Sequence, residues 1–372
     1  MTRDSQPELL ETPRQAAHRR IINLLGPMIG LVLVVFAGGI AEQRMEGSLN
    51  YWSPQNQCLI LTQTVTVAIG AIGMTLVIIS AGIDLSAGSV IALAAVASAW
   101  TVRELAPAGL AGLGGFEAVW VPVVAVVAGV AIGCLAGGAN GFLITRLKLA
   151  PFIITLGMMT FARGAAKGIA DMQRIDAPLN WISEFTAANL VLFRTNFHRV
   201  YDLPLLGEVH IGWVGPVAIS PAVVVTVALA IGAAVLLGRM RFGRHVFAIG
   251  SNEATARLCG IRVERTKWLI YALAGMTFGL AGVTDFGRLS VGDPTTAMGK
   301  ELDIIAAVVI GGGSLSGGAG SVFGSLIGAL LMAHLRNLCV HLGLPNYVQE
   351  MVVGAVIVVA VAVDRLRQRR RD

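Results

Sequence analysis

Apolar stretches recur along the whole chain, and most of the charged residues lie between them. Hydrophobic residues make up 55% of the sequence and charged residues 13%, against about 25% charged in ordinary soluble domains. Such a chain has too little polar surface to cover a soluble core. Because a helix needs about 20 mainly apolar residues to cross a bilayer, we predict an all-α membrane protein of about ten spans, at 21–41, 58–79, 86–102, 119–144, 152–172, 217–238, 268–288, 301–314, 319–341 and 348–364.

The positions of lysine and arginine predict the orientation of these spans. If the N-terminus is cytoplasmic, the cytoplasmic segments carry 18 of the 28 Lys and Arg residues, as the positive-inside rule requires. The predicted organisation is a cytoplasmic segment 1–20, a single transmembrane domain 21–364 and a basic cytoplasmic tail 365–372. Within the domain, 239–267 is the largest cytoplasmic loop and 173–216 is a long outer loop.

Two short segments resemble each other, one in each half of the chain. Asp84 to Val90 reads DLSAGSV, and Ser314 to Val322 reads SLSGGAGSV. With five spans in each half, the halves would have inverted topologies, an arrangement common in transporters. The run 311–318 is too rich in glycine for ordinary helix. It predicts either a tight turn between packed spans or a broken backbone at membrane depth, which must lie inside protein or beside a cavity.

The sequence lacks the motifs of an enzyme. It contains no G-x-x-x-x-G-K-[ST], HExxH or GxSxG, and its glycine-rich run has no lysine to hold a phosphate. The four cysteines are far apart and form no CxxC, so they suggest neither a zinc site nor a disulfide framework. His334, Cys339 and His341 lie close together, where a structural role is favoured over a metal site. The net charge of +6 is concentrated beside the spans, which argues against nucleic-acid binding. We therefore predict a chain without catalytic activity or a bound cofactor.

Charged residues next to spans deserve attention because burying charge in lipid is costly. Asp84 lies at a predicted helix junction, where it could accept backbone N–H groups as a helix cap or contribute directly to a pathway. No run of buried acidic residues of the kind expected for a proton relay is present. The sequence therefore argues against a proton-coupled carrier.

The largest predicted cytoplasmic loop contains the signals of a short helix. Ser251 or Asn252 can cap its N-terminus. Glu253 would lie in the first turn, Arg257 in the last turn, and Gly260 would end it. A helix of about eight residues is marginal alone in water. We therefore expect it to pack either on anionic lipid, which suits its basic flanks, or on a soluble partner protein.

Four blocks occur in a fixed order: GMTLVIISAGIDLSAGS at 73–89, GRHVFAIGSNEATARLCGI at 243–261, IGGGSLSGGAGSVFGSLIG at 310–328, and the ending from Leu342 to Asp364. Together they closely resemble the permease subunits of the ribose/xylose-type bacterial carbohydrate ABC importers. The resemblance extends over residues 58–364. The second block departs from the commonest family pattern at three positions, which are Ala254, Thr255 and Cys259.

The resemblance implies a type II ABC importer-like permease in the bacterial inner membrane, paired with a second permease chain as a homodimer or heterodimer. An ABC ATPase of two fused cassettes would bind ATP and Mg, and a periplasmic solute-binding protein would deliver a monosaccharide or polyol. The helix of the cytoplasmic loop would couple the permease to this ATPase through Asn252, Glu253, Ala254, Thr255, Ala256, Arg257, Leu258 and Gly260. Candidates for the translocation pathway or its core are Thr75, Asp84, Ser86, Gly88, Ser89, Asn140, Thr155, Gly311, Gly312, Gly313, Ser314 and Ser316.

Other functions remain open from the sequence. An amino-acid or nucleoside permease of the same transporter class would have a similar organisation. An ion-coupled carrier or channel would also need many spans, although the buried acids it requires are missing. A membrane scaffold protein would explain the spans but would not explain the four ordered blocks.

Overall fold

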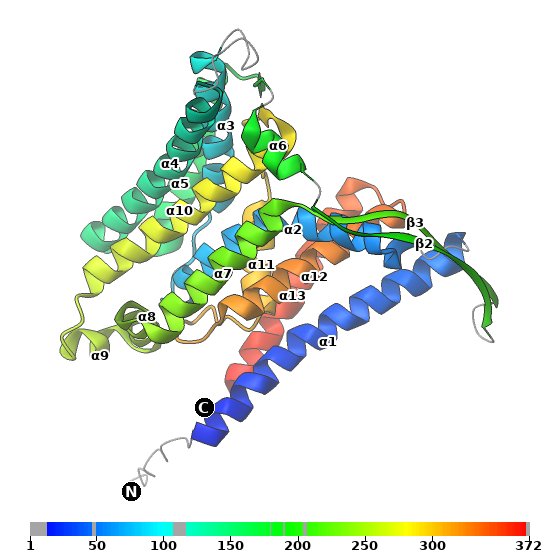
Figure 1. Cartoon of the computed structure of the whole chain (residues 1–372). Helices are drawn as coiled ribbons and strands as arrows, with labels where there is room; N and C mark the ends of the chain where they lie inside the picture. Colours follow the sequence, from blue (N-terminus) through cyan, green and yellow to red (C-terminus); the bar gives the residue numbers. More distant parts are fainter. Residues whose placement is uncertain are drawn as a thin grey trace, which may run out of the picture.

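A computed structural model of the chain describes residues 13–46, 50–106, 117–178, 180–188, 190–203 and 207–369. The described chain is mainly helical, and Figure 1 shows how its elements are arranged. In chain order they are α1 (Pro13–Glu46), η1 (Asn50–Trp52), α2 (Pro54–Ile79), α3 (Ala87–Leu105), α4 (Glu117–Leu147), α5 (Pro151–Ile169), β1 (Ile175–Asp176), α6 (Trp181–Ala187), β2 (Leu190–Leu203), β3 (Gly207–Ile219), α7 (Pro221–Arg239), α8 (Arg241–Ser251), α9 (Glu253–Leu258), α10 (Val263–Leu289), β4 (Val291–Gly292), α11 (Lys300–Ile310), α12 (Val322–His341) and α13 (Asn346–Arg369).

Each of the ten predicted spans forms a helix, which confirms the prediction of a helical membrane protein. Among the described helices, seven are long and apolar enough to cross a bilayer: α1, α2, α3, α4, α7, α10 and α12. The eighth predicted span is shorter than we expected, because α11 has only 11 residues. At 1.5 Å per residue it measures about 16 Å, roughly half of a hydrocarbon core of about 30 Å. It therefore cannot cross the membrane alone.

The predicted outer loop contains regular structure that the sequence analysis did not anticipate. It holds β1, α6 and most of a long antiparallel hairpin, in which Leu190 pairs with Ile219 and Leu203 with Gly207. Aromatic and β-branched residues are frequent in both hairpin strands, and such residues favour extended structure. The fold therefore departs from purely α-helical architecture at this one long excursion. The short strands β1 and β4 also pair, which ties the start of the excursion to the end of α10.

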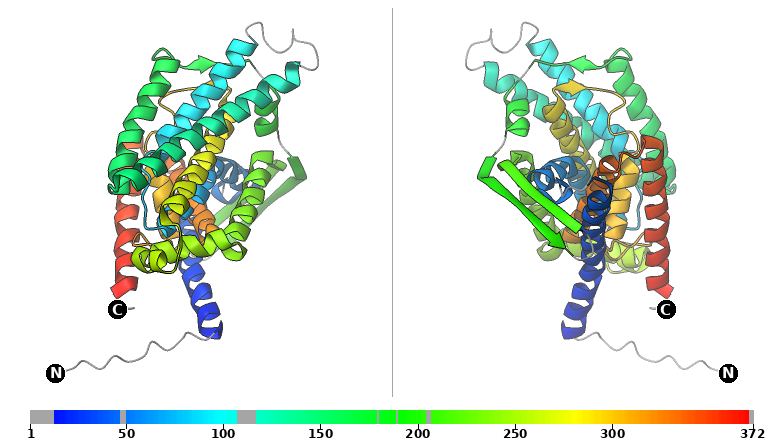
Figure 2. Two further views of the ribbon diagram at one scale, coloured as in Figure 1. Left: turned by 90° about the vertical axis from the view of Figure 1, so that its left-hand side faces the viewer. Right: turned by 90° about the vertical axis from the view of Figure 1, so that its right-hand side faces the viewer.

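The two ends of the described chain lie on one side of the molecule. The first turns of α1 and the last turns of α13 are found at the same end as α8 and α9, and both views of Figure 2 agree on this. The opposite end carries α6 and the last turns of α3 and α10. This arrangement matches an even number of crossings. The assignment of either end to the cytoplasm stays a prediction.

The centre of the bundle is formed by α2, α3 and α10. Within the most apolar 18-residue window of each helix, 89% of the α2 residues and 78% of those of α3 and of α10 are buried in the chain. The corresponding share is 28% for α1, α4 and α7. The three central helices therefore contact protein on nearly every side. The outer helices leave most of their surface for lipid or for another protein chain.

Close backbone contact joins α4 to α10. A Cβ atom on Gly275 of α10 would overlap the carbonyl oxygen of Gly133 and lie 2.8 Å from the Cα of Gly137. A Cβ on Gly279 would lie 2.6 Å from the carbonyl oxygen of Gly129. Small residues at intervals of four permit this approach, which is a common way for helices to associate in lipid.

The start of the bundle is attached through η1. The buried carboxylate of Glu42, near the end of α1, accepts the backbone N–H of Tyr51 at 2.7 Å. The Tyr51 hydroxyl lies 3.0 Å from Nδ1 of His334 in α12. These bonds fix the end of α1 against α12, although most of the remaining surface of α1 is exposed.

We predict that Gly137→Leu destabilises the protein by on the order of 2 kcal/mol or more, because overpacking a tight contact forces backbone shifts. Gly232→Leu on α7 is the matched control, since nothing lies within 4 Å of a Cβ at that position. Thermal unfolding in detergent should show a lower midpoint for the first variant only. Equal midpoints would contradict the importance of the contact between α4 and α10.

Candidate functional site

The predicted helix of the cytoplasmic loop forms as α9. Asn252 has extended backbone angles (φ −159°, ψ 105°), and its side-chain oxygen accepts the N–H of Thr255 at 2.9 Å. Gly260 adopts φ +81° after the helix, and the N–H of Ile261 bonds back to the carbonyl of Ala256 at 3.1 Å. The N-cap and the glycine stop are both confirmed.

A second helix, α8, precedes α9 and was missed by the sequence analysis. It runs from Arg241 to Ser251 and buries Val246 and Ile249. The spacing of Phe242, Val246 and Ile249 repeats every three or four residues, which is the signal of an amphipathic helix. That spacing is the sequence signal that predicts a helix at this place. Asn252 thus separates two helices that lie across the end of the bundle (Figure 1).

Ion pairs hold α9 against the first turns of α10. Lys267 Nζ lies 2.6 Å from the Glu253 carboxylate, and Arg257 pairs with both Glu264 and Glu253. Partial burial raises the pKa of Glu253, but the hydrogen bonds and positive charges of Lys267 and Arg257 outweigh it and leave the pKa below its usual value. Glu253 is therefore charged at neutral pH, and these pairs position α9 from within the chain.

The outer face of α9 carries apolar groups that no other described part of the chain covers. Ala256 is buried against Ile249 and Val263, but Leu258 is 88% exposed. Ala254 and Thr255 are also exposed. Leu258 is therefore accessible to another molecule.

The second predicted set of residues surrounds the segment between α2 and α3. The Asp84 carboxylate accepts the Ser86 N–H at 2.8 Å and the Ser86 hydroxyl at 2.6 Å. Asn140 of α4 donates to the Ser86 hydroxyl at 3.0 Å and reaches Asp84 at 3.5 Å. Thr155 of α5 accepts the N–H of Leu85 at 3.1 Å. Asp84 therefore orders the chain just before α3 begins. The N-cap residue of α3 is Ser86, and no side chain caps the helix, so the prediction that Asp84 caps α3 is wrong.

Thr75 and Ser89, two further polar candidates of this set, are also hydrogen-bonded within the chain. Thr75 shares a hydrogen bond of 2.7 Å with Ser325 of α12, and Ser89 donates to the carbonyl of Ser86 at 3.2 Å. A Cβ on Gly88 would lie 2.5 Å from the backbone carbonyl oxygen of Ala297, so this position has room only for glycine. Six polar side chains of the set are 0% exposed, namely Thr75, Asp84, Ser86, Ser89, Asn140 and Thr155. They form buried packing contacts in this conformation, and a role in lining a pathway stays a prediction.

The glycine-rich run forms a compact turn between α11 and α12. The Ser314 N–H bonds to the Ala319 carbonyl at 3.0 Å, and the Ser314 and Ser316 hydroxyls lie 2.9 Å apart. Gly312 has φ +90°, and Gly313 packs against Val308. The run is therefore a tight turn between packed helices, and it also borders a cavity. Its position at membrane depth stays a prediction.

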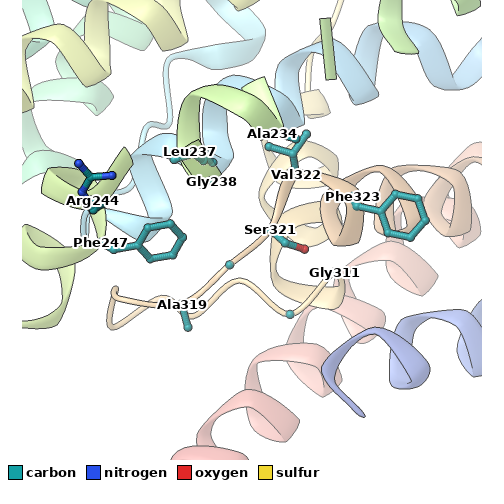
Figure 3. Close-up of a pocket in the computed structure, with 12 residues that line it drawn as sticks. Ala234, Leu237, Gly238, Arg244, Phe247, Gly311, Ala319, Ser321, Val322 and Phe323 are labelled. Carbon is teal, nitrogen blue, oxygen red and sulfur yellow. The ribbon is translucent and has the colours of Figure 1, made fainter. Parts of the chain in front are cut away.

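This cavity measures about 680 Å³ and opens between α7, α8 and the start of α12. Figure 3 shows Arg244 and Phe247 on one side, with Ser321 and Phe323 on the other. Its remaining lining consists of apolar and glycine residues, which are Ala234, Leu237, Gly238, Gly311, Gly312, Ala319, Gly320 and Val322. Among the described residues, no group of three or more His, Cys, Asp and Glu is placed to hold a metal ion.

Residues 57–361 match the family described as the permease component of the branched-chain amino acid transport system. The chain belongs to this permease family. It is 37% identical over 324 residues to the ribose import permease protein of Escherichia coli strain K12, covering 86% of this chain and 89% of that protein. Identity to the ribose import permease protein of Bacillus subtilis strain 168 is 36% over 359 residues, covering 96% and 98%. The xylose transport system permease protein of Haemophilus influenzae is 33% identical over 366 residues, covering 86% and 91%.

These relatives confirm the family predicted from the four sequence blocks. The permease is a multi-pass inner-membrane transport subunit, and its length is nearly that of its relatives. No solved structure shows a significant match to the chain. The roles of individual residues therefore rest on the geometry described above.

We predict that Asp84→Ala destabilises the permease by about 2 kcal/mol or more, because two buried donors of Ser86 and one of Asn140 lose their acceptor. Glu104→Ala is the matched control, since the Glu104 carboxylate is about half exposed and pairs with the exposed Arg103. The measurement is the thermal unfolding midpoint of the purified permease in detergent. An unchanged midpoint for the Asp84 variant would show that the carboxylate does not order this segment.

Proposed function

We propose that the chain forms the membrane pathway of an ATP-driven importer for a monosaccharide or related polyol. The observation that carries this proposal is similarity to ribose and xylose permeases over 86% or more of the chain. The sequence has no phosphate-binding loop, so the energy would come from a separate ABC ATPase that binds ATP and Mg. An ATPase of two fused cassettes suits two permease chains paired in the membrane.

The end of the molecule that carries α8 and α9 would face the cytoplasm. It is rich in exposed basic residues, with Arg239, Arg241 and Arg244 around α8, and the positive-inside rule favours this orientation. Both chain ends would then be cytoplasmic. A periplasmic binding protein would deliver its sugar at the opposite end, where α6 and the β2–β3 hairpin extend from the bundle (Figure 1).

The ATPase would dock on the exposed face of α9. Leu258 is the main apolar anchor, because burying an exposed leucine contributes roughly 1.5–3 kcal/mol. Ala254 and Thr255 lie on the same short helix and leave room for a close approach. Glu253 and Arg257 would contribute indirectly, since their charges are engaged with α10.

A second candidate is an amino-acid importer, which the description of the matching family favours. Uptake into proteoliposomes that contain the permease, its ATPase and its binding protein separates the two. Labelled ribose, xylose, inositol and leucine should be compared with and without ATP. ATP-dependent uptake of one of the first three compounds is expected, and uptake of leucine alone would overturn the sugar assignment.

If the ATPase docks on α9, we expect Leu258→Glu to weaken ATPase binding about tenfold or more. A loss of about 1.4 kcal/mol of binding free energy corresponds to a factor of ten in affinity. Met172→Glu, in the turn after α5, is the matched control, since Met172 is 74% exposed and lies away from α9. Binding should be measured by titrating purified ATPase onto the permease in nanodiscs. Equal affinities for both variants and the unaltered protein would remove α9 as the docking surface.

A further inference from the structure

Three segments that are far apart in the sequence meet behind the docking surface. They are the end of α8, the end of α2 and the glycine-rich turn between α11 and α12. The Gly318 N–H donates to the carbonyl oxygen of Ile79, the last residue of α2, at 2.9 Å. Gly250 of α8 packs on the same two groups: a Cβ there would overlap the Ile79 oxygen and lie 2.6 Å from the Gly318 nitrogen. We call Gly250, Ile79, Gly317 and Gly318 the glycine junction.

Gly317 and Gly318 of the junction have no space for side chains either. A Cβ on Gly317 would lie 2.6 Å from the Gly250 carbonyl oxygen and 2.7 Å from the Cβ of Ala81. A Cβ on Gly318 would lie 2.7 Å from the Ser251 hydroxyl oxygen. Gly317 and Gly318 have φ of +89° and +71°, a region that other residues rarely adopt. The three segments thus touch backbone to backbone.

The junction connects the docking helix to both broken regions of the bundle. Gly250 is two residues from Asn252, which caps α9. Ile79 is followed by the turn that leads to the buried Asp84, and Gly318 is followed within four residues by α12. Gly318 lies within one of the two segments whose sequences resemble each other, and Ile79 precedes the other by five residues.

Direct backbone contact transmits displacement efficiently. Long side chains at an interface can change rotamer when one element moves, whereas packed backbones have no such freedom. A shift of α8 therefore requires Ile79 or Gly318 to move with it, or the hydrogen bond between them to break. Either outcome reaches α2, which is the most buried of the candidate spanning helices.

We propose that Gly250, Gly317 and Gly318 are positioning residues that transmit movement of the docked α9 to the α2–α3 and α11–α12 segments together. The proposal rests on the proposed docking of an ATPase on α9. In it, ATP-dependent movement of α8 breaks or re-forms the bond between Gly318 and Ile79. The two broken segments then change position in one step.

Hydrogen–deuterium exchange of the unaltered permease in nanodiscs provides the test. Adding the ATPase should protect amides 253–260. Adding a non-hydrolysable ATP analogue should then change exchange of the Gly318 amide and of amides 79–82 by tenfold or more. If 253–260 gain no protection, the proposed docking fails. If they are protected while Gly318 and 79–82 do not respond to the nucleotide, docking stands and the junction proposal is overturned.

A matched pair of variants measures the consequence for transport. Gly250→Ala places a methyl group in the junction, whereas Gly232→Ala on α7 places one where nothing lies within 4 Å. We expect the ATP hydrolysed per sugar imported to rise at least tenfold for Gly250→Ala and to be unchanged for Gly232→Ala. A purely structural role would lower hydrolysis and uptake in parallel and would contradict the proposal. If Gly250→Ala does not fold, the exchange experiment on the unaltered protein decides.

Discussion

The contact between α4 and α10 shows the physical constraint on which the bundle depends. In lipid, helices gain little by burying apolar side chains, because the surrounding acyl chains are equally apolar. Helices in lipid therefore attract one another through close packing and through hydrogen bonds between polar groups, since no water is present to bond those groups. Glycines at 129, 133 and 137 on α4 meet glycines at 275 and 279 on α10, and the two backbones touch. With α10 fixed in this way, α2 and α3 pack on its other faces.

The second constraint is that a helix interrupted within the bundle must satisfy its free backbone groups. In the segment between α2 and α3, Asp84 accepts the N–H of Ser86 and Thr155 accepts the N–H of Leu85. Asn140 supports this arrangement by donating to the Ser86 hydroxyl. Tyr271 of α10 packs against the same segment, since a Cβ on Gly82 would lie 2.5 Å from its hydroxyl. The interruption is therefore rigid in this conformation. It can move only if several buried hydrogen bonds change together.

The arrangement suits a subunit whose motion is imposed by a partner. The proposed docking face of α9 is exposed, yet α9 is held to α10 by ion pairs and to the interior through α8. Force applied to α9 would therefore not be absorbed by a flexible loop. The force would reach the contact between α2 and the glycine-rich turn, where the backbones are packed directly against each other.

The sequence by itself determined the ten helical segments, the short capped helix α9 and the permease family. These follow from local signals: apolar length, the Asn252 cap, the stop at Gly260 and four ordered blocks. The helix α8 was not predicted, although the spacing of Phe242, Val246 and Ile249 is a local signal for it. The hairpin was not predicted because pairing of its two strands depends on tertiary context more than on local sequence. It also overestimated α11, because the apolar run continues into glycines that cannot sustain a helix.

Only the tertiary structure decided which candidate residues act together. Asp84, Ser86, Asn140 and Thr155 became one buried cluster, and Glu253 and Arg257 became internal supports while Leu258 remained exposed. Gly250 carries no sign of its importance in the sequence, where it is one of 45 glycines. Its role comes from long-range contact with Ile79 and Gly318. Local chemistry specifies where helices begin and end, but the meeting of distant backbones is set by the packing of the whole bundle.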